Sequence, residues 1–291
     1  MTDSMTAKPV FKNIALLGVG LIGGSIGEAI CARSLAEEVV GIDREAKNLR
    51  AAKRRSAIMR GTRDLARGVA EADLVIICTP VETIVELVGK VADATGPHCL
   101  ITDVGSTKAR IVAEIERNKA AAARFVGSHP LAGSERKGPG NADKHLLESQ
   151  SVILTPTKKT DPTTLRRLKR FWTSLGARTV TMRPAEHDRC IATVSHLPHL
   201  VAAALTASTP DRELAQAASG WLDTTRIAAG DAEMWANILI DNRSHILKSA
   251  SRFGKLVASM CRALEAGDRA ALCKILQDAQ EKRNSARSSD T

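Results

Sequence analysis

The sequence IALLGVGLIG, residues 14–23, decides the fold. Its glycines, Gly18, Gly20 and Gly23, fit the pattern G-x-G-x-x-G, directly after a short apolar run and at the start of an apolar helical stretch. In dinucleotide-binding proteins the first glycine permits a tight turn and the second lets a pyrophosphate approach the backbone. The third lets the helix pack closely on the strand. The pattern alone is weak, but its position between strand and helix predicts a dinucleotide site.

The next predicted strand ends in an acid. Residues 39–42 read VVGI and lead into Asp43, twenty residues after Gly23, which is the spacing of a ribose-binding acid. Its carboxylate would accept hydrogen bonds from the 2′-hydroxyl and repel a 2′-phosphate, so we expect NAD. Arg44 could pair with that phosphate, which leaves NADP as the alternative cofactor. The predicted cofactor-binding residues are Gly18, Gly20, Leu21, Ile22, Gly23, Asp43, Arg44, Thr79 and Pro80.

Short apolar strands alternate with helical stretches over the first part of the chain. We expect strands at 13–17, 39–43, 74–78, 100–103, 125–127, 151–155 and 178–182. Alternation of this kind predicts an α/β fold, with a doubly wound parallel sheet of the Rossmann type. After Met182 the strand pattern disappears and helical periodicity dominates. We therefore predict a dinucleotide-binding domain at residues 1–183 and an all-helical domain at residues 184–291.

Composition argues against several other classes of protein. The formal net charge is +10, but four phenylalanines, three tryptophans and no tyrosine offer few stacking platforms for a nucleic acid. No apolar run approaches the roughly 18 residues of a membrane helix, and no signal-peptide pattern precedes Lys12. We expect a cytoplasmic protein with no membrane or nucleic-acid partner. The six cysteines form no CxxC pair, so neither a zinc site nor a disulfide framework is expected.

Two polar segments follow predicted strands at the edge where a cofactor would bind. The first, DVGSTK, contains Ser106, and the second, GSHPLAGSE, contains His129 and Glu135. The carboxyl ends of strands in an open α/β sheet line the ligand crevice. Histidine has an ordinary pKa near 6.5, which suits a general base at neutral pH. Oxidation of a secondary alcohol needs such a base, because the hydroxyl proton must leave with the hydride.

A third polar cluster opens the helical region. At 3.6 residues per turn, Asp188, His196 and His199 share one side of a helix. The opposite side is apolar and is expected to be core, with Ile191, Val194, Leu197, Val201 and Leu205. Pro198 should kink this helix. The polar side could be a substrate-facing wall, a solvated or structural face, or a metal site. We favour the wall and expect no metal, because the HExxH pattern and a third ligand are missing.

Farther along, Arg226 and Trp235 stand out. Arginine has a planar fork that matches a carboxylate. From spacing alone, however, a surface salt bridge is the better interpretation of Arg226.

Taken in order, these segments resemble a known family. GVGLIGGS, DVGSTK, GSHPLAGSE, HD, SHLPH, TTR and MW, found between about Phe11 and about Arg243, resemble the prephenate/arogenate (cyclohexadienyl) dehydrogenases. The resemblance implies NAD-dependent oxidative decarboxylation of prephenate or arogenate in tyrosine biosynthesis. It also implies a helical C-terminal domain that binds substrate and forms a homodimer. With only helical sequence after Trp235, we expect no appended tyrosine-binding regulatory domain.

The same resemblance implies roles for individual residues. His129 would bind the ring hydroxyl and assist its deprotonation, and Ser106 would position this histidine and the nicotinamide. Arg226 would bind a substrate carboxylate. The resemblance also places Glu135, Asp188, His196, His199 and Trp235 near the substrate.

Two other functions stay open at this point. A β-hydroxyacid dehydrogenase or imine reductase shares the two-domain plan, but those enzymes usually place a lysine on the first long helix of the second domain. This chain has none between His187 and Ala207. A non-catalytic dinucleotide sensor would not need Ser106, His129 and Arg226 to converge. The sequence does not separate prephenate from arogenate, strict NAD use from NADP use, or the oligomeric states, and inhibition by tyrosine at the active site stays open.

Overall fold

The computed structural model describes residues 10–133 and 136–288. Its backbone forms two compact units, Met1–Asn242 and Arg243–Thr291. The predicted boundary at residue 183 lies inside the first unit, at the point where the last strand gives way to helices. That boundary stays a prediction.

One sheet of eight strands forms the centre of the first unit, in the order β3-β2-β1-β4-β5-β6-β7-β8. The strands are β1 Asn13–Leu17, β2 Glu38–Ile42, β3 Arg60–Thr62, β4 Leu74–Ile77, β5 Leu100–Asp103, β6 Phe125–Pro130, β7 Ser151–Thr155 and β8 Arg178–Thr181. All neighbours are parallel except β6 and β7. The chain order reverses at β1, so the ligand crevice is expected beside the carboxyl ends of β1 and β4. The predicted doubly wound α/β fold is confirmed.

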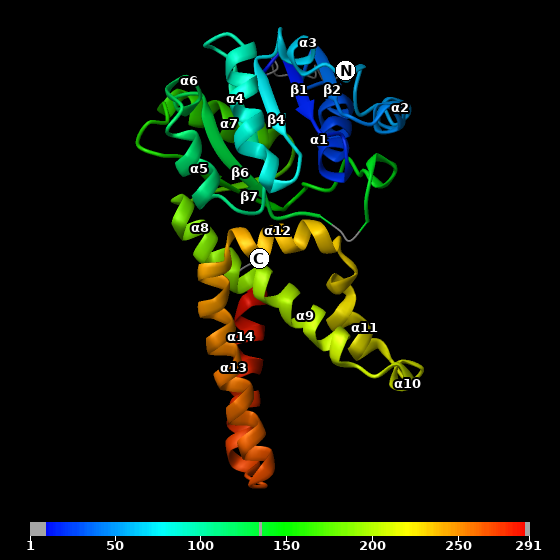
Figure 1. Ribbon diagram of the computed structural model, residues 1–291, viewed down its shortest axis with the longest axis vertical. Coiled ribbons are helices and arrows are strands. Elements are labelled where there is room, and N and C mark those ends of the chain that lie inside the picture. The colour runs from blue at the N-terminus through cyan, green and yellow to red at the C-terminus, as the bar shows by residue number, and fades with distance from the viewer. Residues whose placement is uncertain (1–9, 134–135, 289–291) are drawn as a thin grey trace, which may run out of the picture. The chain divides into compact units, whose positions relative to one another are not determined.

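Helices cover both faces of this sheet (Figure 1). Leu16 belongs to an apolar cluster on one face and its neighbour Leu17 to a second cluster on the other face. A strand buried on both faces explains why its sequence is a continuous apolar run. The helices are α1 Leu21–Ala32, α2 Ala46–Arg54, α3 Leu65–Val69, α4 Ile84–Ala94, α5 Ala109–Ile115, α6 Lys119–Ala122 and α7 Pro162–Ser174, with 3₁₀ turns η1 Val81–Thr83 and η2 Pro139–Asn141.

The rest of the first unit is helical. It contains α8 Pro184–Ile191, the π-helical turn η3 Ala192–His196, α9 Leu197–Ser208, α10 Asp211–Leu214, α11 Ser219–Thr225, the 3₁₀ turn η4 Arg226–Ala229 and α12 Ala232–Asp241. Figure 1 shows α8 and α12 at the same edge of the sheet, where β1 and β4 end. This arrangement brings the helical residues of the predicted site to the carboxyl ends of the strands.

The long helix from Pro184 to Ser208 differs from the prediction in two respects. Its interruption is the π-helical turn Ala192–His196, which ends two residues before Pro198. Its polar side is buried, with His196 0% exposed, and its apolar side is buried only in part: Ile191 is 1% exposed, as predicted, whereas Val194 is 63% and Leu205 is 38% exposed. The prediction that Val194 and Leu205 are core is therefore wrong for the single chain. The polar side turns inward because it hydrogen-bonds to the sheet edge.

By length and composition, Pro184–Ser208 could also cross a membrane, with a mean hydropathy of 1.4 and 28% of the window buried. That test is weak evidence, because a core helix passes it as well. Here the helix carries buried, hydrogen-bonded His187 and Asp188, which a lipid environment would make costly.

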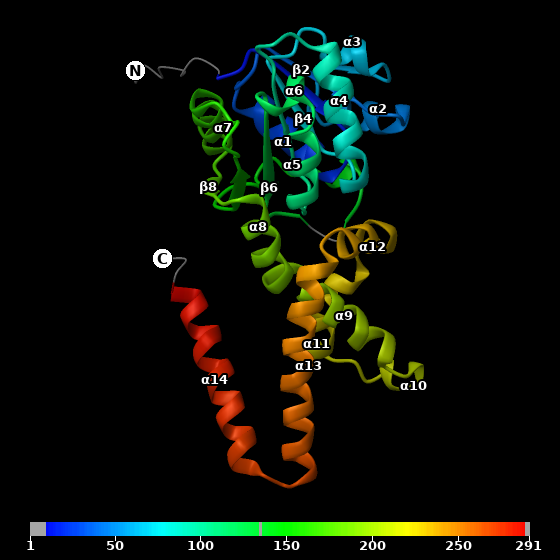
Figure 2. The same ribbon diagram turned by 60° about the vertical axis from the view of Figure 1, so that its left-hand side comes forward.

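The second unit is a helical hairpin of α13 Arg243–Glu265 and α14 Arg269–Ser288 (Figure 2). Gly267 turns the chain between them with a φ of +64°, a conformation that favours glycine. On α13, the side chains of Phe253, Leu256, Val257 and Leu264 are 40%, 49%, 40% and 65% exposed. Their spacing puts these four residues, here called the α13 stripe, on one side of the helix.

Candidate active site

The glycine loop joins β1 to α1. Gly18 has a φ of +87°, and its amide donates a hydrogen bond to the carbonyl of Ile42 at 2.8 Å. Helix α1 begins after Gly20, and in the described chain no side chain caps it and no acid lies in its first turn. The first amides of a helix lack intrahelical partners and carry partial positive charge. This helix start is therefore open to an anion such as a pyrophosphate.

The three glycines have different surroundings, and these fit a dinucleotide. A Cβ atom on Gly23 would lie 2.0 Å from the carbonyl oxygen of Gly18, so only glycine allows this helix–strand contact. A Cβ on Gly20 would meet no protein atom within 4 Å. Gly20 is thus not required by packing. The open space beside it is what a close approach of phosphate to the backbone requires.

Asp43 follows β2 and is held against the glycine loop. Its Oδ2 accepts from the Val19 amide at 3.1 Å, and its Oδ1 accepts from the Glu45 amide at 2.9 Å and from Nδ2 of Asn48 at 3.2 Å. These contacts orient the carboxylate before any ribose arrives. Asn48 was not predicted, and Arg44 is exposed beside this site.

The other predicted cofactor residues also lie at the carboxyl ends of strands. Leu21 and Ile22 form the start of α1, while Thr79 and Pro80 lie between β4 and η1. The Oγ1 atoms of Thr79 and Thr83 are 2.8 Å apart, which ties this loop to the following turn. The residues present therefore fit a dinucleotide.

His129 lies near the end of β6, with 8% of its surface exposed. Its Nδ1 is 2.8 Å from Nε2 of His187 on α8, and Nδ1 of His187 is 2.7 Å from Oδ1 of Asp188. The carboxylate can only accept, so Nδ1 of His187 carries a proton and its Nε2 accepts from Nδ1–H of His129. By this assignment, the lone pair of His129 is on Nε2, the nitrogen not used in the contact.

The surroundings keep His129 neutral. Burial lowers its pKa well below the ordinary value of 6.5, and His187, Lys108 and His196 lower it further. Burial also lowers the pKa of His187, although the hydrogen bond to Asp188 opposes this shift. Burial alone would raise the pKa of Asp188, but hydrogen bonds from His187 and two amides outweigh it, and the pKa is lowered. A neutral His129 beside an ionised Asp188 is ready to accept a proton.

Asp188 joins the helical segment to the DVGSTK loop. Its Oδ1 also accepts from the Lys108 amide at 2.8 Å, and its Oδ2 accepts from the Ala109 amide at 2.9 Å, at the start of α5. Its carbonyl accepts from Nδ2 of Asn242 at 2.8 Å. Asp188 is 3% exposed. Both carboxylate oxygens are already engaged, and substrate contact by Asp188 stays a prediction.

A buried ion pair lies beneath this network. Lys108 and Asp103 are both 0% exposed at their side chains, and the ammonium contacts the Asp103 carboxylate. The Asp103 carboxylate also accepts from the amides of Gly105 and Ser128. The pair therefore ties β5 and β6 together close to His129.

His196, His199 and Trp235 form the other half of the site. The rings of His199 and Trp235 are stacked, with centroids 3.5 Å apart, and His196 meets Trp235 edge to face at 6.1 Å. Nδ1 of His196 is 3.1 Å from Nδ2 of Asn242. A series of contacts thus runs from His129 through His187, Asp188, Asn242 and His196 to Trp235 and His199.

Helix α12 is held at both ends by segments that follow β5 and β6. At its carboxyl end Asp241 contacts the Thr107 hydroxyl and the Arg110 guanidinium, and at its start Asp231 contacts Lys137. Trp235 and Ile238 of α12 pack into the apolar cluster on one face of the sheet. The carboxyl end of the helix therefore lies at the loop that holds Ser106 and Thr107, and Trp235 packs against the apolar cluster of the sheet.

The structure brings most predicted site residues to one edge of the sheet. Ser106 is half-buried three residues after β5. Arg226 is exposed at the start of η4, and its meeting with His129 stays a prediction. Glu135 lies outside the described residues. Three residues were not predicted as functional: His187, Lys108 and Asn242. The HD motif, His187-Asp188, was a sequence signal that could have identified His187.

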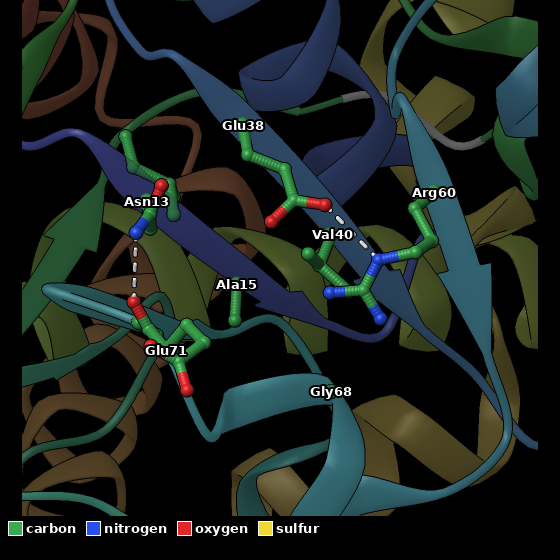
Figure 3. Close-up of a pocket in the computed structure, with 9 residues that line it drawn as sticks. Asn13, Ala15, Glu38, Val40, Arg60, Gly68 and Glu71 are labelled. Carbon is green, nitrogen blue, oxygen red and sulfur yellow. Dashed lines mark hydrogen bonds and ion pairs between the residues drawn. The ribbon is translucent and has the colours of Figure 1, made fainter.

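A small pocket lies elsewhere, at the amino ends of β1 and β2 (Figure 3). Asn13, Glu38 and Arg60 are among its lining residues, and Arg60 pairs with Glu38 at 3.0 Å. Its volume of 10 Å³ is about the room that one water molecule needs. It is therefore too small for a substrate. Among the residues that the structure describes, no group of three metal-ligating side chains occurs.

A dinucleotide cradle and a proton acceptor at the same edge of a parallel sheet meet the needs of hydride transfer, which places the chain in the class of nicotinamide-dependent dehydrogenases. Residues 26–181 match the family "Prephenate dehydrogenase, nucleotide-binding domain", and residues 183–278 match "Prephenate dehydrogenase, dimerization domain". The chain belongs to the prephenate dehydrogenase family. This result confirms the resemblance and sets aside the β-hydroxyacid dehydrogenase alternative.

Individual relatives agree with this assignment. A prephenate dehydrogenase of Bacillus subtilis (strain 168) is 36% identical over 278 residues, which cover 93% of this chain and 75% of that protein. A cyclohexadienyl dehydrogenase of Zymomonas mobilis is 30% identical, covering 94% of this chain and 96% of that protein. The crystal structure of the A. aeolicus prephenate dehydrogenase, in complex with hydroxyphenyl propionate and NAD⁺, is similar with a TM-score of 0.88. Its sequence is 32% identical, and the match covers 94% of this chain and 98% of that one.

Proposed function

We propose that this chain catalyses the NAD-dependent oxidative decarboxylation of prephenate, arogenate or both, as a step of tyrosine biosynthesis. The observation that carries the proposal is the buried, neutral His129, whose Nδ1 is engaged by His187 at the sheet edge that also bears the glycine loop. Family membership and the named relatives support the same reaction.

NAD supplies the acceptor for the hydride. Nε2 of His129 accepts the proton of the ring hydroxyl as the hydride leaves the ring carbon, which becomes a carbonyl. The C–C bond to the ring carboxylate then breaks and carbon dioxide departs. The electron pair of that bond ends on the former carbonyl oxygen, which takes the proton back from His129. The ring becomes aromatic, and no net proton is consumed.

The neighbours of His129 make this proton transfer easier. When His129 becomes an imidazolium, its Nδ1–H still donates to His187, and the negative charge of Asp188 lies one imidazole away. The contacts of Asp188 with the Lys108 and Ala109 amides keep this carboxylate in place. The protein therefore supplies position and charge, while the driving force comes from aromatisation.

Further residues complete the proposal. Ser106, half-buried after β5, positions His129 and the nicotinamide. Arg226 binds a substrate carboxylate, and Glu135 lies near the substrate. Trp235 and His199, stacked on each other, form one wall of the substrate site.

The experiment is steady-state kinetics with each substrate and each cofactor, following absorbance of the reduced nicotinamide. His129→Asn should lower kcat by roughly 10²–10⁴-fold, the contribution of a general base. The matched control is His98→Asn, since His98 is exposed outside the site. An equally active His129→Asn variant would remove this histidine from the mechanism.

We also infer a homodimer. Val194, Leu205 and the α13 stripe are exposed apolar side chains, and all lie within residues 183–278, which match a dimerization domain. Covering such side chains with a second copy would remove apolar area from water. The inferred helical domain at 184–291 is supported by the same match. A cytoplasmic location, in keeping with a biosynthetic enzyme that uses NAD, is part of the proposal.

Sedimentation velocity tests the dimer. Val257→Glu places a charge in the α13 stripe and should produce monomers, whereas Lys255→Glu changes charge on a different side of α13 and should not. A dimer that survives Phe253→Glu and Val257→Glu together would show that the stripe lies outside the interface.

A further inference from the structure

Two buried histidine nitrogens have no hydrogen-bond partner within residues 10–133 and 136–288: Nε2 of His196 and Nδ1 of His199. Buried polar atoms are almost always paired, so an unpaired one needs an explanation such as a missing ligand. His196 is 0% exposed and His199 is 5% exposed. Both rings contact Trp235 at the predicted substrate wall. The unpaired atoms therefore lie at the site already described, and their chemistry constrains the ligand.

Asn242 determines which nitrogen of His196 carries the proton. Nδ2 of Asn242 is 2.8 Å from the carbonyl oxygen of Asp188, and a carbonyl only accepts. That contact identifies the amide nitrogen of Asn242 and rules out the flipped orientation, which would place two oxygens together. The same nitrogen is 3.1 Å from Nδ1 of His196, and an amide nitrogen only donates. Nδ1 of His196 therefore accepts, and Nε2 carries the proton.

We propose that Asn242 fixes His196 as a hydrogen-bond donor, and that its Nε2–H binds an oxygen of the substrate side chain, a carboxylate or keto oxygen, and excludes an ammonium group. The proposal rests on the function proposed above. It makes Asn242 a positioning residue that acts through His196. Asn242 lies outside every motif of the family resemblance, at the end of α12.

The electrostatic surroundings support a neutral donor. Burial lowers the pKa of His196 to about 4, so the ring is not an imidazolium at neutral pH. The edge-to-face contact with Trp235 is a weak interaction and does not replace an oxygen acceptor. His199 has no such fixed tautomer, because its unpaired Nδ1 can donate or accept as the ligand requires.

The site then has two histidines of opposite hydrogen-bonding character. His129 presents a lone pair on Nε2, which suits a hydroxyl that gives up its proton. His196 presents an N–H, which suits an oxygen acceptor. Asp188 orients the partners of both histidines. Its carboxylate accepts from His187, which contacts His129, and its carbonyl accepts from Asn242, which contacts His196. A substrate with a ring hydroxyl at one end and a carboxylated side chain at the other matches this order.

Two ligands with the same ring test the donor. The probes are 3-(4-hydroxyphenyl)propionate, which ends in a carboxylate, and tyramine, which ends in an ammonium group. Their affinities are measured by calorimetry on the full chain saturated with NAD. The wild type should bind the propionate and discriminate against tyramine. Tyramine binding as tightly as the propionate would overturn the proposal.

Variants of His196 separate donation from packing. His196→Asn places its amide near the position of Nδ1 and should weaken propionate binding about tenfold to a hundredfold, as expected for a lost hydrogen bond to a charged group. His196→Gln extends its amide to the position of Nε2 and should recover part of that affinity. Tyramine binding should not weaken in either variant. Equal losses in His196→Asn and His196→Gln would indicate a purely structural role and overturn the proposal.

The tautomer has its own readout, ¹⁵N NMR of histidine-labelled protein. In the wild type, His196 should show Nε2–H and unprotonated Nδ1 at neutral pH. Asn242→Leu keeps a similar side-chain volume, and it should give a mixture of tautomers and weaker propionate binding. In the His196→Gln background, Asn242→Leu should have no further effect on affinity. An Nδ1–H tautomer in the wild type would overturn the inference.

The same measurements distinguish failure of the proposed reaction from failure of the donor assigned to His196. A wild type with the Nε2–H tautomer that binds the propionate but does not oxidise prephenate or arogenate would contradict the reaction and support the donor. A wild type that oxidises either substrate while His196 shows Nδ1–H would support the reaction and contradict the donor.

Discussion

The Nδ1 atom of His129 lies 2.8 Å from the Nε2 atom of His187, and this contact decides which nitrogen of His129 can act as a base. His187→Leu removes the partner, so the proton of neutral His129 can move to Nε2 and block proton acceptance. We expect kcat to fall at least about tenfold, and by no more than the roughly 10²–10⁴-fold that general-base catalysis contributes. The KM for NAD should stay unchanged, because the glycine loop is untouched. Steady-state kinetics with both substrates varied measures the two effects.

The matched variant for this contact is His187→Gln. Its side-chain carbonyl can accept from Nδ1–H of His129, although it cannot extend the contact to Asp188. It should therefore recover part of the lost kcat. If His187→Leu and His187→Gln were equally slow, or both as fast as the wild type, the contact would not control the base.

The pH profile should show that His129 is neutral throughout the physiological range. A base can accept a proton only when unprotonated, so kcat/KM is lost as pH falls through the pKa of His129. Burial, followed by His187, Lys108 and His196, lowers that pKa well below 6.5. The fall in kcat/KM on the acidic side should therefore occur below pH 6.5. Above pH 6.5, this group should leave the profile of kcat/KM flat. A limb at or above pH 6.5 would contradict a buried, neutral base.

Removal of the Lys108 charge should move that limb toward higher pH, because a positive neighbour that disfavours imidazolium is gone. Lys108→Met alone leaves Asp103 buried and unpaired, which costs about 3–5 kcal/mol of stability. The double variant Asp103→Asn with Lys108→Met removes both charges and should be more stable than Lys108→Met. The pH profile is measured on the double variant, and an unmoved limb would show that Lys108 does not act on His129.

The glycines of the loop should separate folding from cofactor binding. Gly20→Ala adds a methyl group that meets no protein atom within 4 Å, so Tm should not change. The methyl group would occupy the space of the pyrophosphate, and overpacking of roughly 1–3 kcal/mol would weaken NAD binding about tenfold to a hundredfold. Gly23→Ala would meet the Gly18 carbonyl at 2.0 Å and should lower Tm itself.

The control for this pair is Gly89→Ala on α4, where an added Cβ also meets nothing within 4 Å. It lies away from the loop in a helix interior and should raise stability by about 0.5–1 kcal/mol without changing NAD affinity. If Gly20→Ala bound NAD as tightly as Gly89→Ala does, the cofactor would not approach the backbone at Gly20.

Local sequence signals predicted what depends on neighbours along the chain. The spacing of Gly18, Gly20, Gly23 and Asp43 was enough to predict the loop and the acid that contacts it. His129 was found because it comes directly after the short apolar run of the predicted strand 125–127, although β6 itself extends to Pro130. By contrast, β3 contains only Arg60, Gly61 and Thr62, so it has no apolar run to reveal it.

Contacts between distant segments left no such signal. His187 is 58 positions from His129, and Asn242 is 54 positions from Asp188. Nothing in the sequence pattern pairs them, because the pairing depends on how α8 and α12 meet the sheet edge. The same cause turned the polar side of the helix that carries His196 inward and left Val194 and Leu205 exposed, although Ile191 is buried as expected. Apolar side chains were expected inside, but the inner face is set by hydrogen bonds to that edge.

The buried histidines should make the fold sensitive to mild acid. His196 has a pKa lowered by burial to about 4 in the folded protein, against 6.5 when unfolded. Between these values the unfolded chain binds more protons, so stability falls as pH falls from about 6.5 to about 4. For His196 alone the loss is about 3 kcal/mol, and His129, His187 and His199, whose pKa values are also lowered, add to it. Above pH 6.5 these groups should not make the free energy of unfolding depend on pH.

Urea unfolding at pH 7 and pH 4 measures the difference in the free energy of unfolding. This difference should shrink in His196→Gln and stay the same in the exposed control His98→Gln. An equal acid loss in the wild type and in His196→Gln would mean that His196 is not held neutral by burial, and the donor assigned to its Nε2 would then lose its electrostatic support.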